Sequence, residues 1–300
     1  MLQSRILAAG PTSGEIKDVR QQIGVACTNC YKPGQDFKRC ERCKTSYYCS
    51  RECQKSHWPK HKTFCKEIEG SAMKSLLENV IANKILFNSL QALLAIEFDL
   101  PNNPQLIRKP LMVRLDYVVE PANLEDLHSL LKSKSKDASG SIMGMFQLTN
   151  MISPRSGGSS APLTPMRQSM WETARREVDE GGGYNTPVGL VELANNDSPQ
   201  TQTFPLFIMP NALDMVKKME PALIPTDGPA IVAKRISVHS YMEHINATIR
   251  HDTENRWLLR KKMRDSDKKM IRDVAAKNWK SYAALYFNEK MKREFVYKQT

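Results

Sequence analysis

All seven cysteines of this 300-residue chain lie in one short segment, residues 27–65. The same segment supplies a histidine, so eight metal-ligating side chains occur as four close pairs: Cys27 and Cys30, Cys40 and Cys43, Cys49 and Cys53, and His61 and Cys65. Eight sulfur and nitrogen ligands are what two tetrahedral zinc ions require. A segment this short cannot bury enough apolar surface to fold alone, and zinc supplies the missing free energy, on the order of 10 kcal/mol or more. The sequence therefore predicts a small module built on two zinc ions.

The spacing within each pair indicates how the ligands reach a metal ion. Two residues between cysteines allow both sulfurs of a tight turn to bind one ion, at about 2.3 Å. Three residues between ligands place them one helical turn apart, as for His61 and Cys65. His57 is an alternative eighth ligand, but only His61 stands one turn from Cys65. Spacing alone leaves open whether consecutive or interleaved pairs share an ion.

A disulfide framework is the alternative interpretation of a cysteine cluster. Seven is an odd number, and residues 1–26 lack the continuous apolar stretch of an export signal. We therefore expect free thiolates that act as zinc ligands, in a reducing intracellular compartment, either nucleus or cytoplasm.

The order of these residues resembles the MYND-type zinc finger. The pattern is C-x2-C, C-x2-C, Tyr-Cys-Ser-x2-Cys-Gln and Trp-x2-His-x3-Cys, and it spans residues 27–65. The resemblance implies interleaved binding, with one zinc ion on Cys27, Cys30, Cys49 and Cys53 and the other on Cys40, Cys43, His61 and Cys65. It also implies that the finger binds short peptides containing proline and leucine, and that Gln54 and Trp58 line the peptide groove. Glu41 departs from the family pattern, in which a small or hydroxyl residue is common at that position.

The residues between the last four ligands agree with this interpretation. Ser50 is a good N-cap three residues before Cys53, and Pro59 suits the first turn of a second helix. Gln54 and Trp58 are one turn apart and are expected on the side opposite the metal, where a tryptophan beside an amide can hold an extended proline-rich peptide. The alternative is that Trp58 fills the small core of the finger.

The rest of the chain, residues 66–300, predicts a separate α+β domain of unknown type. Hydrophobic periodicity predicts one long helix over 71–98, shorter helices over 123–132 and 211–219, and two helices after residue 238. Strands are expected at 111–119, 142–149, 188–193 and 204–209. The expected fold class is therefore α+β, with a treble of loops and short helices around two zinc ions, then a body with a small sheet and C-terminal helices. Residues 1–26 are expected to be flexible, and the Ser-, Gly- and Pro-rich segment near 153–187 to be a mobile insertion.

Three further patterns concern partners. Residues 241–300 hold fifteen Lys or Arg against eight Asp or Glu, so basic C-terminal helices could contact nucleic acid, although a solvated helical face is the favoured interpretation. Pro221–Pro225 reads Pro-Ala-Leu-Ile-Pro, a peptide of the type that such fingers bind, which raises self-association as a hypothesis. No segment reaches 18 uninterrupted apolar residues, so we expect no membrane partner.

These observations predict a zinc-dependent adaptor or regulatory protein and not an enzyme. Each zinc site has a full set of protein ligands, which leaves no position for a catalytic water. Hydrolase and nucleotide-binding signatures do not occur. Some SET-type lysine methyltransferases carry a finger of this type, but they also resemble one another in a second cysteine-rich zinc site, and this chain has no cysteine after Cys65.

Overall fold

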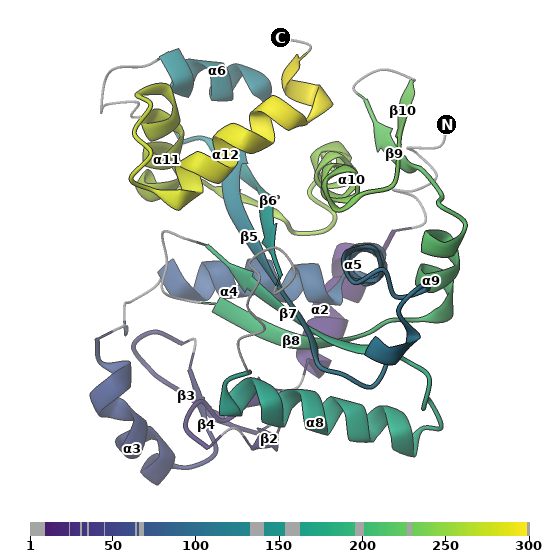
Figure 1. Cartoon of the computed structure of the whole chain (residues 1–300). Helices are drawn as coiled ribbons and strands as arrows, with labels where there is room; N and C mark the ends of the chain where they lie inside the picture. Colours follow the sequence, from purple (N-terminus) through teal and green to yellow (C-terminus); the bar gives the residue numbers. More distant parts are fainter. Residues whose placement is uncertain are drawn as a thin grey trace.

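The computed structural model of the chain describes residues 10–23, 25–30, 32–34, 36–44, 46–63, 65, 69–132, 141–153, 163–195, 201–226 and 230–298. Two units follow one another along the chain (Figure 1): a finger over residues 25–65 and a larger body from residue 69 onward. The finger contains two antiparallel strand pairs and one helix: β1 (Val25–Ala26) with β2 (Pro33–Gly34), β3 (Lys38–Arg39) with β4 (Tyr47–Tyr48), and α3 (Arg51–His61). Helix α2 (Ser13–Gln22) precedes the finger.

A five-stranded mixed sheet lies at the centre of the body (Figure 1). Its strands, in spatial order, are β11 (Arg260–Lys262), β6 (Met143–Ile152), β5 (Leu111–Pro121), β7 (Val188–Ala194) and β8 (Thr201–Phe207). Strands β5 and β7 run parallel, and the other neighbours run antiparallel. All seven residues of β7 are buried, which is typical of a strand covered on both faces.

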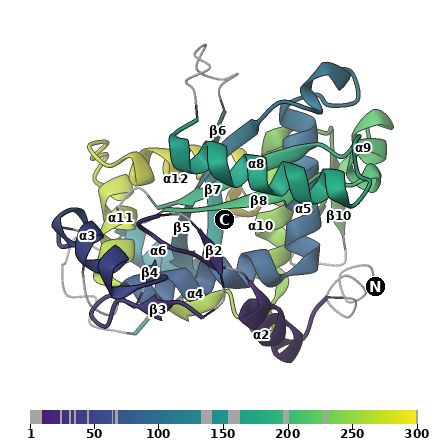
Figure 2. The same cartoon turned by 90° about the horizontal axis from the view of Figure 1, so that it is seen from below.

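Helices surround this sheet. They are α4 (Glu69–Ala82), α5 (Lys84–Glu97), α6 (Leu124–Lys132), α8 (Pro165–Glu180), α9 (Pro210–Lys217), α10 (Val238–His251), α11 (Asp265–Ala275) and α12 (Tyr282–Arg293), with short 3-10 turns at Pro104–Leu106 and Phe295–Lys298. A hairpin of β9 (Ala222–Pro225) and β10 (Ile231–Lys234) packs against α10. Seen from below in Figure 2, α8 and α4 lie on opposite sides of β7 and β8.

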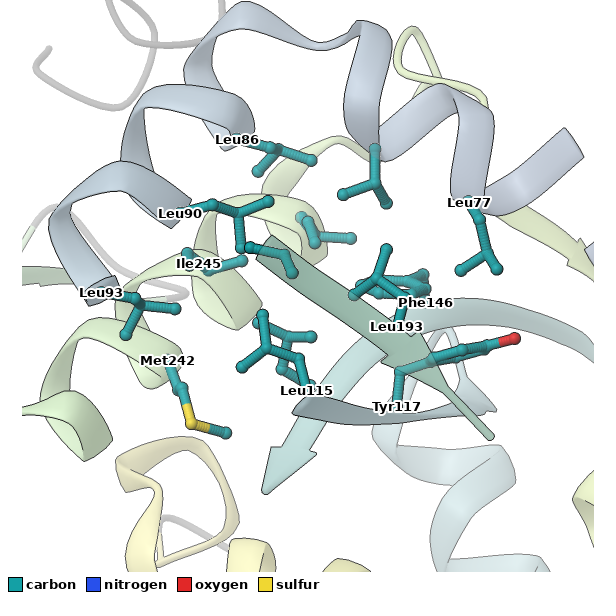
Figure 3. Packing of buried hydrophobic residues seen from close by; sticks show 14 of the residues in the cluster. Leu77, Leu86, Leu90, Leu93, Leu115, Tyr117, Phe146, Leu193, Met242 and Ile245 are labelled. Atoms are coloured by element: carbon teal, nitrogen blue, oxygen red, sulfur yellow. The ribbon is translucent and has the colours of Figure 1, made fainter. Parts of the chain in front are cut away.

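The core of the body forms where α4, α5 and α10 meet the sheet (Figure 3). The buried side chains shown there come from both layers: Leu77, Leu86, Leu90 and Leu93 from α4 and α5, Leu115, Tyr117, Phe146 and Leu193 from the strands, and Met242 and Ile245 from α10. Gly189 of β7 permits a close approach of α5 to the sheet, because a Cβ there would lie 2.2 Å from Cδ2 of Leu94 in α5. Burial on this scale gives the body a core of its own.

The predicted α+β class is confirmed. The strands expected at 111–119, 142–149 and 188–193 and the helix expected at 123–132 all form, with small differences at their ends. The fourth strand, expected at 204–209, begins earlier, at Thr201, and ends at Phe207. The helix expected at 211–219 forms as α9.

The prediction of one helix over residues 71–98 is wrong, because the chain bends at Asn83. The fully buried Asn83 caps α5 by accepting hydrogen bonds from the backbone N–H groups of Ile85 (3.0 Å) and Leu86 (3.3 Å). The apolar spacing continues through the break, so periodicity did not reveal it, whereas the capping asparagine starts a new helix. The axes of α4 and α5 differ by 83°.

This bend also bears on membrane insertion. Within the described ranges, no single helix is both long and apolar enough to cross a bilayer; only α4 and α5 taken together reach that length and composition. Both helices supply side chains to the core of the body, including Leu77 and Leu90.

Two segments expected to be flexible contain well-capped helices. In the lead-in 1–26, of which residues 1–9 lie outside the description, Thr12 and Glu15 form a capping box that begins α2, and Ile16 is fully buried. In the predicted insertion 153–187, Thr164 caps α8 and Pro165 occupies its first turn; residues 154–162 lie outside the description. Both start signals are present in the sequence, but the surrounding Gly, Ser and Pro residues concealed them.

The C-terminal region holds three helices and a strand, where two helices were expected. Helix α10 ends at His251, and Asp252 then accepts hydrogen bonds from the N–H groups of Arg256 (2.9 Å) and Trp257 (2.8 Å). The turn that these bonds form directs the chain into β11, which pairs with residues 143–145 of β6. The buried Leu259 and Met263 flank β11, so these apolar residues lie at the ends of an edge strand and not on a continued helix.

Candidate metal centre

Two tight turns of the finger present the first four cysteines. Cys27 and Cys30 lie on the turn between β1 and β2, where the Cys27 N–H donates to the carbonyl of Lys32 at 2.9 Å. Cys40 and Cys43 lie on the turn between β3 and β4, where the Lys44 N–H donates to the carbonyl of Cys40 at 2.8 Å. Lys44 has a φ of 55°, and this left-handed residue returns the chain to β4 after the second cysteine.

Helix α3 supplies two of the remaining four ligands. Ser50 caps it by accepting the Cys53 N–H at 3.2 Å, as predicted, so Cys53 falls in the first turn and His61 in the last. The prediction of a second helix starting at Pro59 is wrong, since Pro59 lies inside α3. The ladder resumes after the proline, where the Lys62 N–H donates to the carbonyl of Trp58 at 2.9 Å.

The eight ligands form two groups of four, each with its ligand atoms within 4.8 Å of one another. The first group is Cys27, Cys30, Cys49 and Cys53, and the second is Cys40, Cys43, His61 and Cys65. This is the interleaved arrangement that the resemblance implies. His57 belongs to neither group, because its Nδ1 pairs with the hydroxyl of Tyr48 at 2.9 Å.

The distances within each group fit tetrahedral zinc. Sulfur atoms at about 2.3 Å from a tetrahedral centre are separated by about 3.8 Å, and a sulfur and an imidazole nitrogen by about 3.5 Å. The sulfurs of Cys30 and Cys49 are 3.6 Å apart and those of Cys40 and Cys65 are 3.7 Å apart. Nε2 of His61 lies 3.4 Å from the Cys40 sulfur and 3.5 Å from that of Cys43. All seven cysteines are unbridged, so both clusters fit the two zinc ions of such a finger.

Electrostatics explains why these clusters need a cation. Burial raises the pKa of Cys65 to about 12, and the hydrogen bond with Cys53 is the main reason that the pKa of Cys49 rises to about 12. Burial also opposes ionisation of Cys27, but hydrogen bonds from the backbone N–H groups of Cys30, Cys49 and Asn29 outweigh it and lower its pKa to about 6. One thiolate is therefore favoured in the first cluster, and the thiols with a raised pKa ionise when a divalent ion neutralises them. Burial also lowers the pKa of His61, which keeps the imidazole neutral, as a ligand must be. Its Nδ1 lies 3.4 Å from the hydroxyl of Ser46, a contact that orients the ring.

The predicted peptide-binding residues lie on α3. Gln54 is half-buried, and Trp58 is 41% exposed, with its ring centroid 5.9 Å from that of His61 in an edge-on contact. Trp58 therefore covers a zinc ligand with one part of the ring and presents the rest to solvent. Whether the pair binds a peptide stays a prediction.

The residues proposed for other partners are engaged within the body. Ala222 and Ile224, inside Pro221–Pro225, are buried and pair with β10. Arg260 donates to the carbonyls of Arg250 (2.7 Å) and Asp252 (2.9 Å), and Lys268 is 6% exposed. The predicted basic patch is thus only partly a surface.

Sequence reasoning missed a buried charge network, which consists of Glu120, Arg250, Lys290, Glu294 and Tyr297. Lys290 Nζ lies 2.8 Å from Glu120 and 3.1 Å from Glu294, and Tyr297 donates to Glu120 at 2.7 Å. Arg250 forms a further ion pair with Glu120. Glu120 and Lys290 have no exposed surface. Glu120 lies on β5, Arg250 on α10 and Lys290 on α12, whereas Glu294 directly follows α12 and Tyr297 lies in the last 3-10 turn. Lys290 and Glu294 are one helical turn apart, but Glu120 and Arg250 are distant in sequence, so spacing alone does not reveal the network.

Comparison with known proteins addresses the body first. Residues 68–297 match the family described as "Domain of unknown function (DUF8205)". This match covers more than half of the chain.

The chain belongs to the DUF8205 family.

In front of this DUF8205 body, residues 27–65 match the MYND finger, in agreement with the resemblance found in the sequence.

Individual relatives match the finger alone. SET domain and MYND-type zinc finger protein 6 of Schizosaccharomyces pombe is 39% identical over 54 residues, 18% of this chain and 11% of that protein. MYND-type zinc finger protein MUB1 of Saccharomyces cerevisiae is 39% identical over 61 residues, 20% of this chain and 10% of that protein. Human histone-lysine N-methyltransferase SMYD3 is 44% identical over 43 residues, 14% and 10% of the two chains. This chain thus spans about a tenth of the length of these relatives, and no solved structure matches it.

Proposed function

We propose that this protein is a zinc-dependent adaptor whose MYND finger binds a short peptide containing proline and leucine. The observation that carries the proposal is the exposed face of Trp58, held on α3 by the adjacent zinc ligand His61. An aromatic ring fixed in this way loses little entropy on binding and suits the flat surface of an extended proline-rich segment. Gln54, one turn earlier, offers an amide to the peptide backbone.

The proposal includes a non-catalytic role in an intracellular, reducing compartment. Each cluster already has four protein ligands, so the zinc ions act as structural centres. The names of two relatives, human SMYD3 and SMYD2 of Gallus gallus, include methyltransferase activity, but those proteins share only the finger with this chain. Nucleic-acid binding by the C-terminal helices is the alternative, and the internal hydrogen bonds of Arg260 speak against it.

Self-association through Pro221–Pro225 remains a separate hypothesis. This segment forms β9, whose backbone is paired with β10, so docking into a finger requires the hairpin to open. A synthetic peptide of residues 215–230 tests the recognition step without that cost.

Fluorescence anisotropy of labelled PxLxP peptides with the zinc-loaded full chain tests the proposed function. We expect Trp58→Ala and Gln54→Ala each to weaken binding by about tenfold or more. Trp279→Ala is the matched control, since Trp279 is 42% exposed and belongs to the body. Equal affinity in the Trp58 and Trp279 variants, or no binding by the wild-type chain, would refute peptide recognition at this site.

A further inference from the structure

A polar cleft of about 430 Å³ lies where the finger meets the body. Its walls come from three places: Lys17 and Arg20 of α2, Arg39 and Lys44 of the finger, and Lys74 and Glu78 of α4. Figure 2 shows β3, α4 and α2 side by side along this edge of the molecule. The volume falls within the range of small-ligand sites, about 300–1,000 Å³.

The lining of the cleft carries an excess of positive charge. Glu78 is the single carboxylate among its lining residues, and it is shared between Arg20 at 3.0 Å and Lys74 at 3.4 Å. The ion pairs of the described residues leave Lys17, Arg39 and Lys44 without a carboxylate. Like charges gathered in a concave site raise one another's energy, and an anion relieves that cost.

The donors that remain in the cleft indicate the kind of anion. Arg20 donates to Glu78 at 3.0 Å and to the hydroxyl of Ser75 at 3.2 Å, which leaves the exposed Lys17, Arg39 and Lys44 as donors for a ligand. Two cations lie over the ring of Tyr47: the ammonium of Lys74 is 3.5 Å from the ring centroid and the guanidinium of Arg39 is 5.2 Å from it. Cations on this ring leave it unsuited to stacking against a nucleobase, which favours a compact oxyanion.

We propose that this cleft binds a phosphate monoester. Such a group carries between one and two negative charges at neutral pH and three acceptor oxygens, which suit Lys17, Arg39 and Lys44, the three cleft cations that no carboxylate of the described residues pairs. A lone carboxylate has one charge and would leave part of the excess uncompensated.

The site is separate from the proposed peptide groove. Adjacent residues of a strand point to opposite faces: Tyr48 contacts His57 of α3, whereas Tyr47 faces the cleft. Because Arg39 and Lys44 flank zinc ligands on the second turn of the finger, the cleft also needs zinc to exist. A bound phosphate would therefore fasten the finger to α2 and α4.

Isothermal titration calorimetry of the zinc-loaded full chain tests this site. The probes are O-phosphoserine, a phosphoserine hexapeptide, the same hexapeptide with serine, and a DNA oligonucleotide. We expect both phosphorylated probes to bind and the serine peptide not to bind. Equal affinities for O-phosphoserine and the phosphoserine hexapeptide would indicate a small-molecule ligand. Tighter binding of the phosphoserine hexapeptide would indicate a phosphorylated protein segment.

The double variant Lys17→Gln/Lys44→Gln removes two exposed cleft charges and should weaken binding by about tenfold or more. Lys55→Gln/Lys60→Gln is the control, with the same charge change on exposed residues of α3. Trp58→Ala should bind the phosphorylated probes normally. Equal losses in the two double variants, no binding by the wild type, or binding of the oligonucleotide alone would overturn the proposal.

Discussion

Removing the charge of Glu120 should destabilise the body more than any surface substitution. The network contains two cations, Arg250 and Lys290, and two carboxylates, Glu120 and Glu294, all at most 8% exposed. In Glu120→Gln the side-chain shape is kept, but both cations then face Glu294 alone. Removing one partner of a buried ion pair costs about 3–5 kcal/mol, because the remaining charge stays desolvated.

This magnitude can be measured as a shift in the unfolding midpoint. For a unit of roughly 230 residues, 3–5 kcal/mol corresponds to a loss of about 6–10 °C in Tm. The control is Glu289→Gln, which breaks an ion pair with Lys292 at 2.9 Å in which the two side chains are 53% and 65% exposed. This exposed pair should contribute less than about 1 kcal/mol.

A double-mutant cycle identifies the source of the effect. Lys290→Met removes one cation, so Glu120→Gln/Lys290→Met should be more stable than the sum of the single changes predicts, by more than about 1 kcal/mol. Calorimetry and guanidinium titration of the zinc-loaded chain supply the values. If Glu120→Gln were no more destabilising than Glu289→Gln, the reasoning from buried charge would be refuted.

Three other outcomes follow from the structure. Burial alone would raise the pKa of Glu120, but the charges of Lys290 and Arg250 outweigh burial and lower the pKa in the folded state. The stability that the Glu120 carboxylate contributes is therefore present above about pH 4.5 and is lost as the pH falls through the lower folded pKa. Acid titration should consequently bring the stabilities of the wild type and Glu120→Gln together. Gly189→Ala should cost about 1–3 kcal/mol by denaturant titration, because its Cβ would overlap Leu94, whereas Gly181→Ala, with its nearest neighbour at 3.4 Å, should be nearly neutral. Chelation should remove two equivalents of zinc, as measured by elemental analysis. The finger amides should then exchange with solvent while the amides of the central sheet stay protected. Persistent protection of the finger amides would contradict this expectation.

The metal centre could be predicted from the sequence because its information is local. Pairs such as Cys27 and Cys30 are read from spacing, and Ser50 marks the helix that carries Cys53. The sharing of ions between distant pairs was not available from spacing and came from the resemblance. The continuation of α3 through Pro59 was missed, since the rule that proline starts a helix was applied where proline lies inside one.

The body was predicted less well because its decisive features depend on tertiary contacts. Periodicity found the strands but not the break at Asn83, where one buried side chain overrides a continuous apolar stripe. The charge network is harder still to predict from the sequence, because Glu120 and Lys290 are 170 residues apart. Each is of a type normally found at the surface, and only the folded structure shows that it is buried. Patterning identifies which segments are apolar, but not which polar residues the packing encloses.

The chain contains two separate hydrophobic clusters, one in the finger and one in the body, and the two units are stabilised in different ways. The cluster of the finger consists of four cysteines and Tyr48, with Cys30, Phe37 and Cys53 at its edge, so the stability of the finger comes from metal binding. The cluster of the body draws on Ile16 of α2 and on helices and strands throughout residues 76–287, and it contains none of the eight metal ligands. The relatives that match only the finger are therefore similar to this chain in the way a zinc module folds. In this chain the finger meets the DUF8205 body at the basic cleft between α2, α4 and the turn that carries Cys40 and Cys43, where Lys74 of the body lies 3.5 Å from the ring centroid of Tyr47 in the finger.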